Sequence, residues 1–331
     1  MIGLFQSTLT AWAADDQIFK LQTKVMGTQT EIQICGVAPE IARPAIEEAF
    51  TEMRRLEALM HPDLKESDIY QLNAAAGRQP IKLHPEVFSI IKLAQEIARQ
   101  SDGAFDVTFA GAGQLWDFHN PDAPIPSDQR IAEAVKVVNY RLLVLDHERQ
   151  TAFLSKPGMR VGLGGVAKGY AADAALQVLK KHGLTDAIVH LGGEMLISGT
   201  KAGQPWTIGI QHPRKDSGQL YAVLHLMGTT TASTSGDYER YFFRSGVRYH
   251  HILNPHNGKP ARLCQSVTIL APTGMLADIL ATTVFVLGPA KGLDFLHRYY
   301  PNCEALILDA QGREHLSESF ASHAKIQRVN Q

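Results

Sequence analysis

The order of strand-like and helix-like segments constrains the fold of this chain more than any other feature. Residues 19–35 alternate apolar and polar side chains on both sides of Met26-Gly-Thr28, which is typical of two strands joined by a tight turn. We predict helices at 41–60, 86–99 and 169–182, and strands at Thr185–Leu196, Trp206–Gln211 and Leu220–Gly228. This succession predicts an α+β fold, in which helices pack against mixed or antiparallel sheets.

The chain is long enough to bury a large core, since it has 331 residues of which 45% are hydrophobic. It contains no internal repeat, low-complexity tract or long linker that would separate two independent domains. We therefore expect one domain over residues 19–331. The 32 Lys and Arg against 33 Asp and Glu give a net charge of −1, which creates no basic field for nucleic acid or an anionic membrane.

The segment Met1–Ala14 is apolar, lacks Lys and Arg, and carries Ala11-Trp12-Ala13 near its end. An A-x-A-like pattern after an apolar stretch is typical of the end of a signal peptide. We expect residues 1–18 to be a signal-peptide remnant or a flexible N-terminus, and the protein to be exported to the periplasmic side. A cytosolic protein with a frayed terminus is the alternative. The stretch is shorter than the roughly 20 residues that span a bilayer, so we expect no stable membrane span.

The three cysteines, Cys35, Cys264 and Cys303, lie far apart and form no CxxC pair. Zinc ribbons and disulfide frameworks have characteristic cysteine spacings, so the sequence supports neither. We expect these residues to be core or surface thiols.

A glycine-rich segment, Val161–Asp173 (VGLGGVAKGYAAD), lies at the start of a predicted helix. Glycines let backbone N–H groups approach an anion, and the N-terminus of the helix adds a positive dipole, so this segment is a candidate phosphate site. It is not a Walker A loop, because Ala167 precedes Lys168 and Gly169 follows it. An ordinary structural turn is the alternative.

The apolar segment Ala271–Gly288 has the length of a helix and carries Asp278 and Thr282 four residues apart. This spacing places a carboxylate and a hydroxyl on one helical face, and both are hard oxygen ligands that Mg²⁺ accepts. The alternative is a threonine that bonds back to its own helix beside a solvent-facing aspartate.

Two polar segments, Ser233–Arg240 and Tyr249–Gly258, contain glycine and lie between predicted strands. The second carries His250 and His251, which could supply a general base or bind a metal. Zinc is the weaker interpretation, because no Cys or Glu lies nearby at ligand spacing.

Eight short motifs follow one another along the chain. They are Met26-Gly-Thr28, Ser67–Asn73, Gly103–Thr108, Gly164–Tyr170, Leu191-Gly-Gly193, Thr234–Tyr238, His250–Ile252 with Asn254-Pro255, and Ala277-Asp278 with Thr282. In this order they resemble the motifs of the FAD:protein FMN transferase family, also called the ApbE family. The resemblance covers nearly the whole chain, and although each motif is modestly specific, eight in sequence are not expected by chance.

The resemblance implies a flavin-binding fold of two closely associated lobes, with FAD in the cleft between them and Mg²⁺ at its pyrophosphate. The metal ligands that it implies are Asp278, Thr282 and the backbone carbonyl of Ala167. The FAD contacts that it implies are Met26, Ala104, Phe105, Asp106, Gly164, Tyr170 and Ile252, with Lys168 close enough to neutralise phosphate charge.

The implied reaction transfers FMN from FAD to a Ser or Thr hydroxyl of an acceptor protein and releases AMP. Mg²⁺ would neutralise the developing charge on the phosphate oxygens. His251 is the candidate base, because it adjoins Ile252 and an imidazole can accept a hydroxyl proton near neutral pH. Two alternatives share the fold: an FAD pyrophosphatase that gives FMN and AMP, and a non-catalytic FAD-binding carrier.

Two positions depart from the family pattern. Asp63 stands where the family usually has an aromatic residue that stacks on the flavin ring. Gly162 stands where an acidic residue commonly opens the glycine-rich segment. We therefore expect flavin stacking at the first position and metal or backbone geometry at the second to differ from the family pattern.

Overall fold

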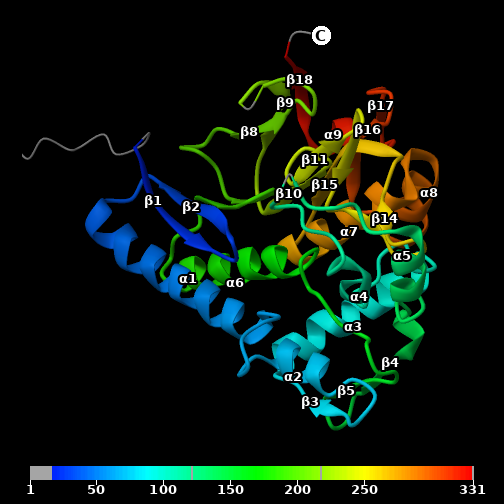
Figure 1. Cartoon of the computed structure of the whole chain (residues 1–331). Coiled ribbons are helices and arrows are strands. Elements are labelled where there is room, and N and C mark those ends of the chain that lie inside the picture. The colour runs from blue at the N-terminus through cyan, green and yellow to red at the C-terminus, as the bar shows by residue number, and fades with distance from the viewer. Residues whose placement is uncertain (1–16, 121, 217, 330–331) are drawn as a thin grey trace, which may run out of the picture.

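The centre of the molecule is an eight-stranded sheet in which every pair of neighbouring strands is antiparallel (Figure 1). The computed structural model describes residues 17–120, 122–216 and 218–329, so the predicted signal segment Met1–Ala14 lies outside the described residues. In spatial order the strands are β1 (Ile18–Val25), β2 (Thr28–Cys35), β6 (Ala187–Leu191), β7 (Glu194–Ser198), β10 (Thr230–Gly236), β15 (Cys264–Ala271), β16 (Glu304–Asp309) and β17 (Glu314–Leu316).

The large sheet is covered on both faces. Helices pack on one face, where Ile32, Val189 and Val267 of the sheet join the main core. These helices are α1 (Pro39–Met60), α6 (Ala167–Lys181), α7 (Gly274–Leu287) and α8 (Pro289–Tyr299). The other face carries a second core beneath a three-stranded sheet of β8 (Trp206–Gln211), β9 (Leu220–Leu226) and β18 (Lys325–Arg328), together with the short helix α9 (Phe320–His323). Strand β15 is consequently buried at all eight positions.

A smaller lobe lies beside the helical layer and is drawn in cyan to green in Figure 1. It contains α2 (Asp68–Ala74), β3 (Ile81–Lys82), α3 (Pro85–Gln100), α4 (Ala110–Gly113), α5 (Asp128–Val135), the 3₁₀ turn η1 (Tyr140–Leu142), β4 (Leu143–Asp146) and β5 (Thr151–Leu154). Two short hairpins complete the chain, formed by β11 (Tyr241–Arg244) with β12 (Val247–His250) and by β13 (Leu253–Asn254) with β14 (Lys259–Pro260).

Helices α6 and α7 approach each other closely at two glycines. A Cβ atom added to Gly169 would lie 2.0 Å from the carbonyl oxygen of Gly274, so no larger residue fits there without movement. The carboxylate of Asp173 on α6 accepts hydrogen bonds from the N–H groups of Gly274 and Met275 at 2.6 and 2.9 Å. These contacts dock the N-terminus of α7 on α6 and bring Asp278 next to the start of α6.

The predicted elements are present, with three corrections. The predicted strand Thr185–Leu196 is two strands, β6 and β7, because Gly192 takes a φ of 65° and opens a hairpin turn there. Neither polar segment lies wholly between strands, since Ser233–Gly236 form the end of β10 and Tyr249–His250 form the end of β12. Helix α1 begins at Pro39, two residues before the predicted start at residue 41. Within the described residues, no helix is both long enough and apolar enough to span a membrane.

Candidate active site

A cavity of about 870 Å³ opens between the large sheet and the smaller lobe. Two hairpin turns form one wall: β1 turns into β2 through Met26 and Gly27, with φ of 52° and 71°, and the β6–β7 turn lies next to it because β2 pairs with β6. The remaining walls come from segments far apart in the sequence. These segments are 62–63, 104–118, 160–168, 234–240, 251–255 and the face of α7 that carries Asp278 and Thr282.

The floor of the cavity holds Lys168, Glu194 and Asp278, which we call the charged cluster. The Lys168 Nζ lies 2.9 Å from Glu194 Oε1 and 3.4 Å from Asp278 Oδ1, and Gly169 donates its N–H to Asp278 Oδ2 at 3.0 Å. Both carboxylates are almost completely buried, at 2% and 3% side-chain exposure, whereas Lys168 retains 23%. The lysine is therefore the member of the cluster that can reach a ligand in the cavity most directly.

Burial alone would lower the pKa of Lys168, but the carboxylates of Asp278 and Glu194 raise it above its ordinary value, so its amine is charged at neutral pH. Burial and the neighbouring Asp278 raise the pKa of Glu194 to about 8, although Lys168 opposes the shift. Glu194 therefore holds a proton at neutral pH, and a cation bound beside the two carboxylates would displace that proton.

The donor atoms of this region are oxygens of the kind that Mg²⁺ prefers. Asp278 and Thr282 lie one turn apart on α7, and the Thr282 hydroxyl is 3.3 Å from that of Ser235. Glu194 Oε2 is buried and has no hydrogen-bond partner among the described residues. No group of three or more His, Cys, Asp and Glu side chains in the described residues could hold a metal. A magnesium site here would therefore combine the two carboxylates with a hydroxyl and backbone oxygens.

Neighbouring histidines have different environments. His250 is 2% exposed, donates from Nε2 to the carbonyl oxygen of Ala261 at 2.7 Å, and accepts the Ile252 N–H on Nδ1 at 3.3 Å. Both ring nitrogens of His250 are thus occupied by the backbone, and the ring packs edge-on against Phe285. His251 lines the cavity instead, and its Nδ1 is buried without a hydrogen-bond partner in the described part of the chain.

The surroundings of His251 change its acid–base behaviour. Burial, together with the positive charge of Arg240, lowers the pKa of His251 to about 3. The imidazole is therefore neutral across the physiological range in the protein without substrate.

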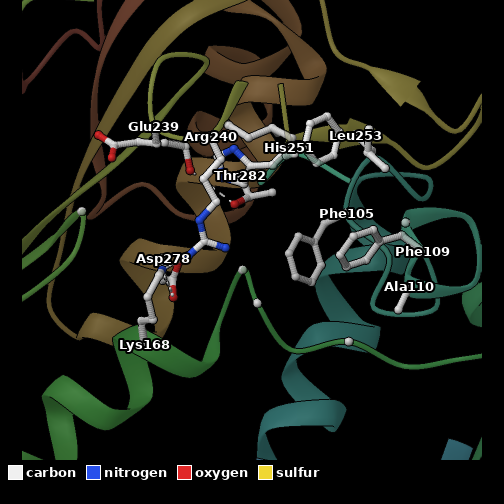
Figure 2. A pocket seen from close by; sticks show the side chains of 18 of the residues that line it. Phe105, Phe109, Ala110, Lys168, Glu239, Arg240, His251, Leu253, Asp278 and Thr282 are labelled. Carbon is white, nitrogen blue, oxygen red and sulfur yellow. Dashed lines mark hydrogen bonds and ion pairs between the residues drawn. The ribbon is translucent and has the colours of Figure 1, made fainter. Parts of the chain in front are cut away.

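The loop at 104–106 supplies both an aromatic wall and a structural anchor. Phe105 lines the cavity together with Phe109, and Figure 2 shows both rings on the side opposite the charged cluster. Asp106 also lines the cavity, but its carboxylate accepts three hydrogen bonds at 2.7–2.8 Å from Thr108 and Tyr140. Asp106 therefore holds the shape of this loop.

The structure brings most of the predicted site residues together. The predicted residues that line the cavity are Ala104, Phe105, Asp106, Gly164, Lys168, His251, Ile252, Asp278 and Thr282. Three other predicted residues are not among the described residues that line the cavity: Met26, Ala167 and Tyr170. Met26 belongs to the turn next to Gly27, Ala167 begins α6, and the Tyr170 hydroxyl donates to Glu86 Oε1 at 3.1 Å.

Both departures from the family pattern lie on the cavity. Asp63 lines it next to Pro62, so the residue at this position does face the site. Gly162 lines it as well, and a Cβ atom there would lie 2.9 Å from the Cβ of Ala110. A side chain at residue 162 would therefore require Ala110 to move, which explains why glycine fits this chain.

Four charged residues that line the cavity were not predicted from the sequence: Arg160, Glu194, Glu239 and Arg240. Glu194 follows the Gly192-Gly193 turn, and its acidic side chain at the start of an apolar strand was the available signal. Arg240 follows Glu239 at the end of the polar segment, and in Figure 2 its side chain extends into the part of the cavity that holds Asp278 and Lys168.

The comparisons with known proteins agree with one another. A family model described as the ApbE family matches residues 26–307. A relative from Treponema pallidum (strain Nichols), named FAD:protein FMN transferase, is 32% identical over 318 residues, which cover 91% of this chain and 87% of the relative. The solved ApbE protein of Thermotoga maritima MSB8 has 34% identity and a TM-score of 0.83, over 93% of this chain and 99% of that one. The flavin transferase ApbE from Vibrio cholerae has 26% identity and a TM-score of 0.82 over the same shares. These matches confirm the resemblance and the predicted α+β fold: this chain belongs to the ApbE family.

Proposed function

We propose that this protein is a magnesium-dependent transferase that moves FMN from FAD onto a Ser or Thr hydroxyl of an acceptor protein and releases AMP. The relatives named FAD:protein FMN transferase support flavin transfer. One observation carries the more detailed proposal: a single cavity is lined by the charged cluster, by Thr282 and by His251. A pyrophosphate and an incoming hydroxyl can therefore meet in one place.

The shape and chemistry of the cavity fit FAD. Its volume of about 870 Å³ lies within the roughly 300–1,000 Å³ usual for ligand sites. Phe105 and Phe109 offer aromatic surface for the isoalloxazine ring, and Gly164 lies between them and Lys168 in the sequence. We place the flavin ring toward the two phenylalanines and the pyrophosphate toward the ammonium group of Lys168.

The charged cluster fits Mg²⁺, because its partnerless oxygen on Glu194 is buried beside Asp278. Asp278, Thr282 and Glu194 would hold the ion, together with the backbone carbonyl of Ala167. When bound, Mg²⁺ would neutralise negative charge on the pyrophosphate oxygens. Lys168 would then exchange one of its carboxylate contacts for a phosphate oxygen and fix the orientation of the FMN-side phosphorus.

Transfer needs one proton to move. The acceptor hydroxyl oxygen attacks the FMN-side phosphorus, the bond from that phosphorus to the AMP oxygen breaks, and AMP leaves with the bonding electrons. The hydroxyl proton passes to the imidazole of His251, which lines the cavity and is neutral. Arg240 lies on the same wall and can contact the charge that develops on the transferring phosphate.

Product analysis separates this proposal from its two alternatives. The protein is incubated with FAD and Mg²⁺, with and without an extract of source-organism cells that lack this protein. AMP together with protein-bound flavin fluorescence on a denaturing gel supports transfer. Free FMN and AMP in equal amounts, with or without extract, would indicate an FAD pyrophosphatase. Unchanged FAD in both samples would indicate a carrier, and omission of Mg²⁺ tests the metal requirement.

A further inference from the structure

The β11–β12 hairpin grows directly out of the cavity wall. Glu239 and Arg240, just before β11, and His251, just after β12, all line the cavity, and Figure 2 shows the three together on one side of it. The His251 N–H donates to the Arg240 carbonyl oxygen at 3.1 Å and closes the base of the hairpin. At its tip, Ser245 and Gly246 take φ of 48° and 75°, as a two-residue turn requires.

One face of this hairpin is fixed to the body of the protein. Phe242 and Tyr249 are paired across the strands, and their rings stack with centroids 5.5 Å apart. Trp116 stacks on Tyr249 at 5.8 Å, and Phe118 stacks on Phe242 at 6.1 Å. Since Phe118 also lines the cavity, the hairpin is held in a defined position beside the site.

The opposite face is exposed and is not polar. Tyr241 and Phe243 are 39% and 51% exposed, and their rings meet edge-to-face at 5.6 Å. The Arg248 guanidinium lies 3.9 Å from the centroid of the Tyr241 ring and 4.9 Å from that of Phe243. We call Tyr241, Phe243 and Arg248 the hairpin face. Aromatic residues and arginine are the side chains most enriched at the centres of protein interfaces.

The surroundings of the hairpin face are positively charged. Arg244, Arg248 and Arg262 place their guanidinium groups on aromatic rings or backbone carbonyls, and within the described part of the chain they form no ion pair. The carboxylate of Asp237, at the base of the hairpin, is already paired with Arg214 through two contacts of 2.7 Å. This positive charge stands out in a chain whose net charge is −1, and it favours an acidic partner.

We propose that the hairpin face is the docking surface for the acceptor protein, and that it binds an acidic segment close to the residue that is modified. The proposal rests on the proposed function, because only a transferase to protein needs such a surface. Strands β11 and β12 are four residues long, which corresponds to about 13 Å. If the acceptor hydroxyl lies at His251, residues of the acceptor about three or four positions along its sequence from that hydroxyl would contact Tyr241 and Phe243.

The test compares Phe243→Ser with Val144→Ser, since Val144 is 52% exposed on β4 in the other lobe and forms a matched control. Both variants and the wild type are given FAD, Mg²⁺ and extract from source-organism cells that lack this protein. We expect Phe243→Ser to lower the rate of protein labelling about 10- to 30-fold, as for a residue central to an interface. FAD affinity, measured by flavin fluorescence, should be unchanged in both variants.

A charge reversal tests the acidic character of the partner. We expect Arg248→Glu to lower protein labelling more than Lys92→Glu, which reverses an exposed charge on α3. The wild-type labelling rate should also fall as salt is raised from roughly 0.05 to 0.3 M, with a weaker fall in Arg248→Gln. Equal salt dependence in wild type and Arg248→Gln would remove the acidic partner from the proposal.

The remaining outcomes distinguish failure of this proposal from failure of the proposed function. If the wild type labels no protein, the proposed function fails and the docking surface with it. If wild type and Phe243→Ser label protein equally, transfer stands and the docking surface is overturned. Sedimentation then identifies what binds the hairpin face instead. A wild-type dimer that dissociates in Phe243→Ser would indicate a second copy of this chain. Cosedimentation with anionic phosphatidylserine vesicles that is lost in Phe243→Ser would indicate a lipid surface.

Discussion

Separate replacements of His251 and His250 by alanine should have different effects. The first should mainly lower the rate of transfer, and the second should mainly lower the free energy of unfolding. His251 faces the cavity with a partnerless Nδ1, so His251→Ala removes a proton acceptor and breaks no side-chain hydrogen bond on that atom. We expect the rate of transfer to fall about 10²- to 10⁴-fold, the usual contribution of a general base. The free energy of unfolding should fall by about 1 kcal/mol, as for an average substitution. FAD affinity should be retained.

His250→Ala is the matched control because its ring nitrogens serve the backbone. Its removal strands the carbonyl of Ala261 and the N–H of Ile252, both in buried positions. Each buried group left unpaired costs about 1–3 kcal/mol, so the free energy of unfolding should fall by about 2–6 kcal/mol. The rate of transfer per folded molecule should fall less than in His251→Ala.

The assay is single-turnover formation of protein-bound flavin, with urea denaturation on the same samples. The pH profile adds an independent check, because kcat/KM reports the pKa values of the protein without substrate. Burial lowers the pKa of His251 to about 3, so His251 should give no acid limb between roughly pH 5 and 8. A wild-type limb near pH 6.5 that His251→Ala abolishes would refute the effect of burial. An undiminished transfer rate in His251→Ala would refute its role as base.

Three further outcomes follow from the structure. Asp278→Asn should abolish AMP release at every Mg²⁺ concentration tested, and near wild-type release at ordinary Mg²⁺ would exclude Asp278 as a metal ligand. Asp63→Tyr should tighten FAD binding by about 0.5–1.5 kcal/mol, because it adds a stacking ring to the cavity rim; fluorescence titration measures this, and unchanged affinity would mean that the Phe105 side already provides the stacking. Burial lowers the pKa of His250 to about 4, so the stability that depends on its neutral form is present above about pH 6.5 and is lost as pH falls toward 4, by at most about 1.4 kcal/mol per pH unit. Urea denaturation of His250→Asn should show a shallower loss over this window, and an identical slope would contradict the assignment.

Local patterns in the sequence were sufficient for elements that have one exposed face. The strands around Met26 alternate because β1 lies at the edge of the sheet and keeps side chains in solvent, and Gly183, with a φ of 75°, ends α6 where the sequence predicts. Strand β15 has no alternation, because helices cover one of its faces and the second sheet covers the other. The sequence pattern of β15 therefore could not identify it as a strand without knowledge of the elements that pack on it.

The site shows the same division between local and long-range information. Asp278 and Thr282 could be paired from their spacing, since one helix carries both. Lys168 and Glu194 join them only through the packing of α6 on α7 and the pairing of β7 with β10. The sequence favours His251 over His250 only because His251 adjoins Ile252. Their different roles depend on Ala261 and on the cavity, which tertiary structure alone brings to them.

The cavity takes its walls from residues between Gly27 and Thr282, so nearly the whole chain must be present before the site exists. During synthesis, the hairpin turn and the glycine-rich segment emerge long before α7, which supplies Asp278 and Thr282. A nascent or truncated chain that lacks α7 therefore has neither the carboxylate nor the helix packing that seats Lys168. A chain that ends before α7 should therefore bind no FAD at this cavity, whereas the elements after Thr282 add no residue to the described cavity lining.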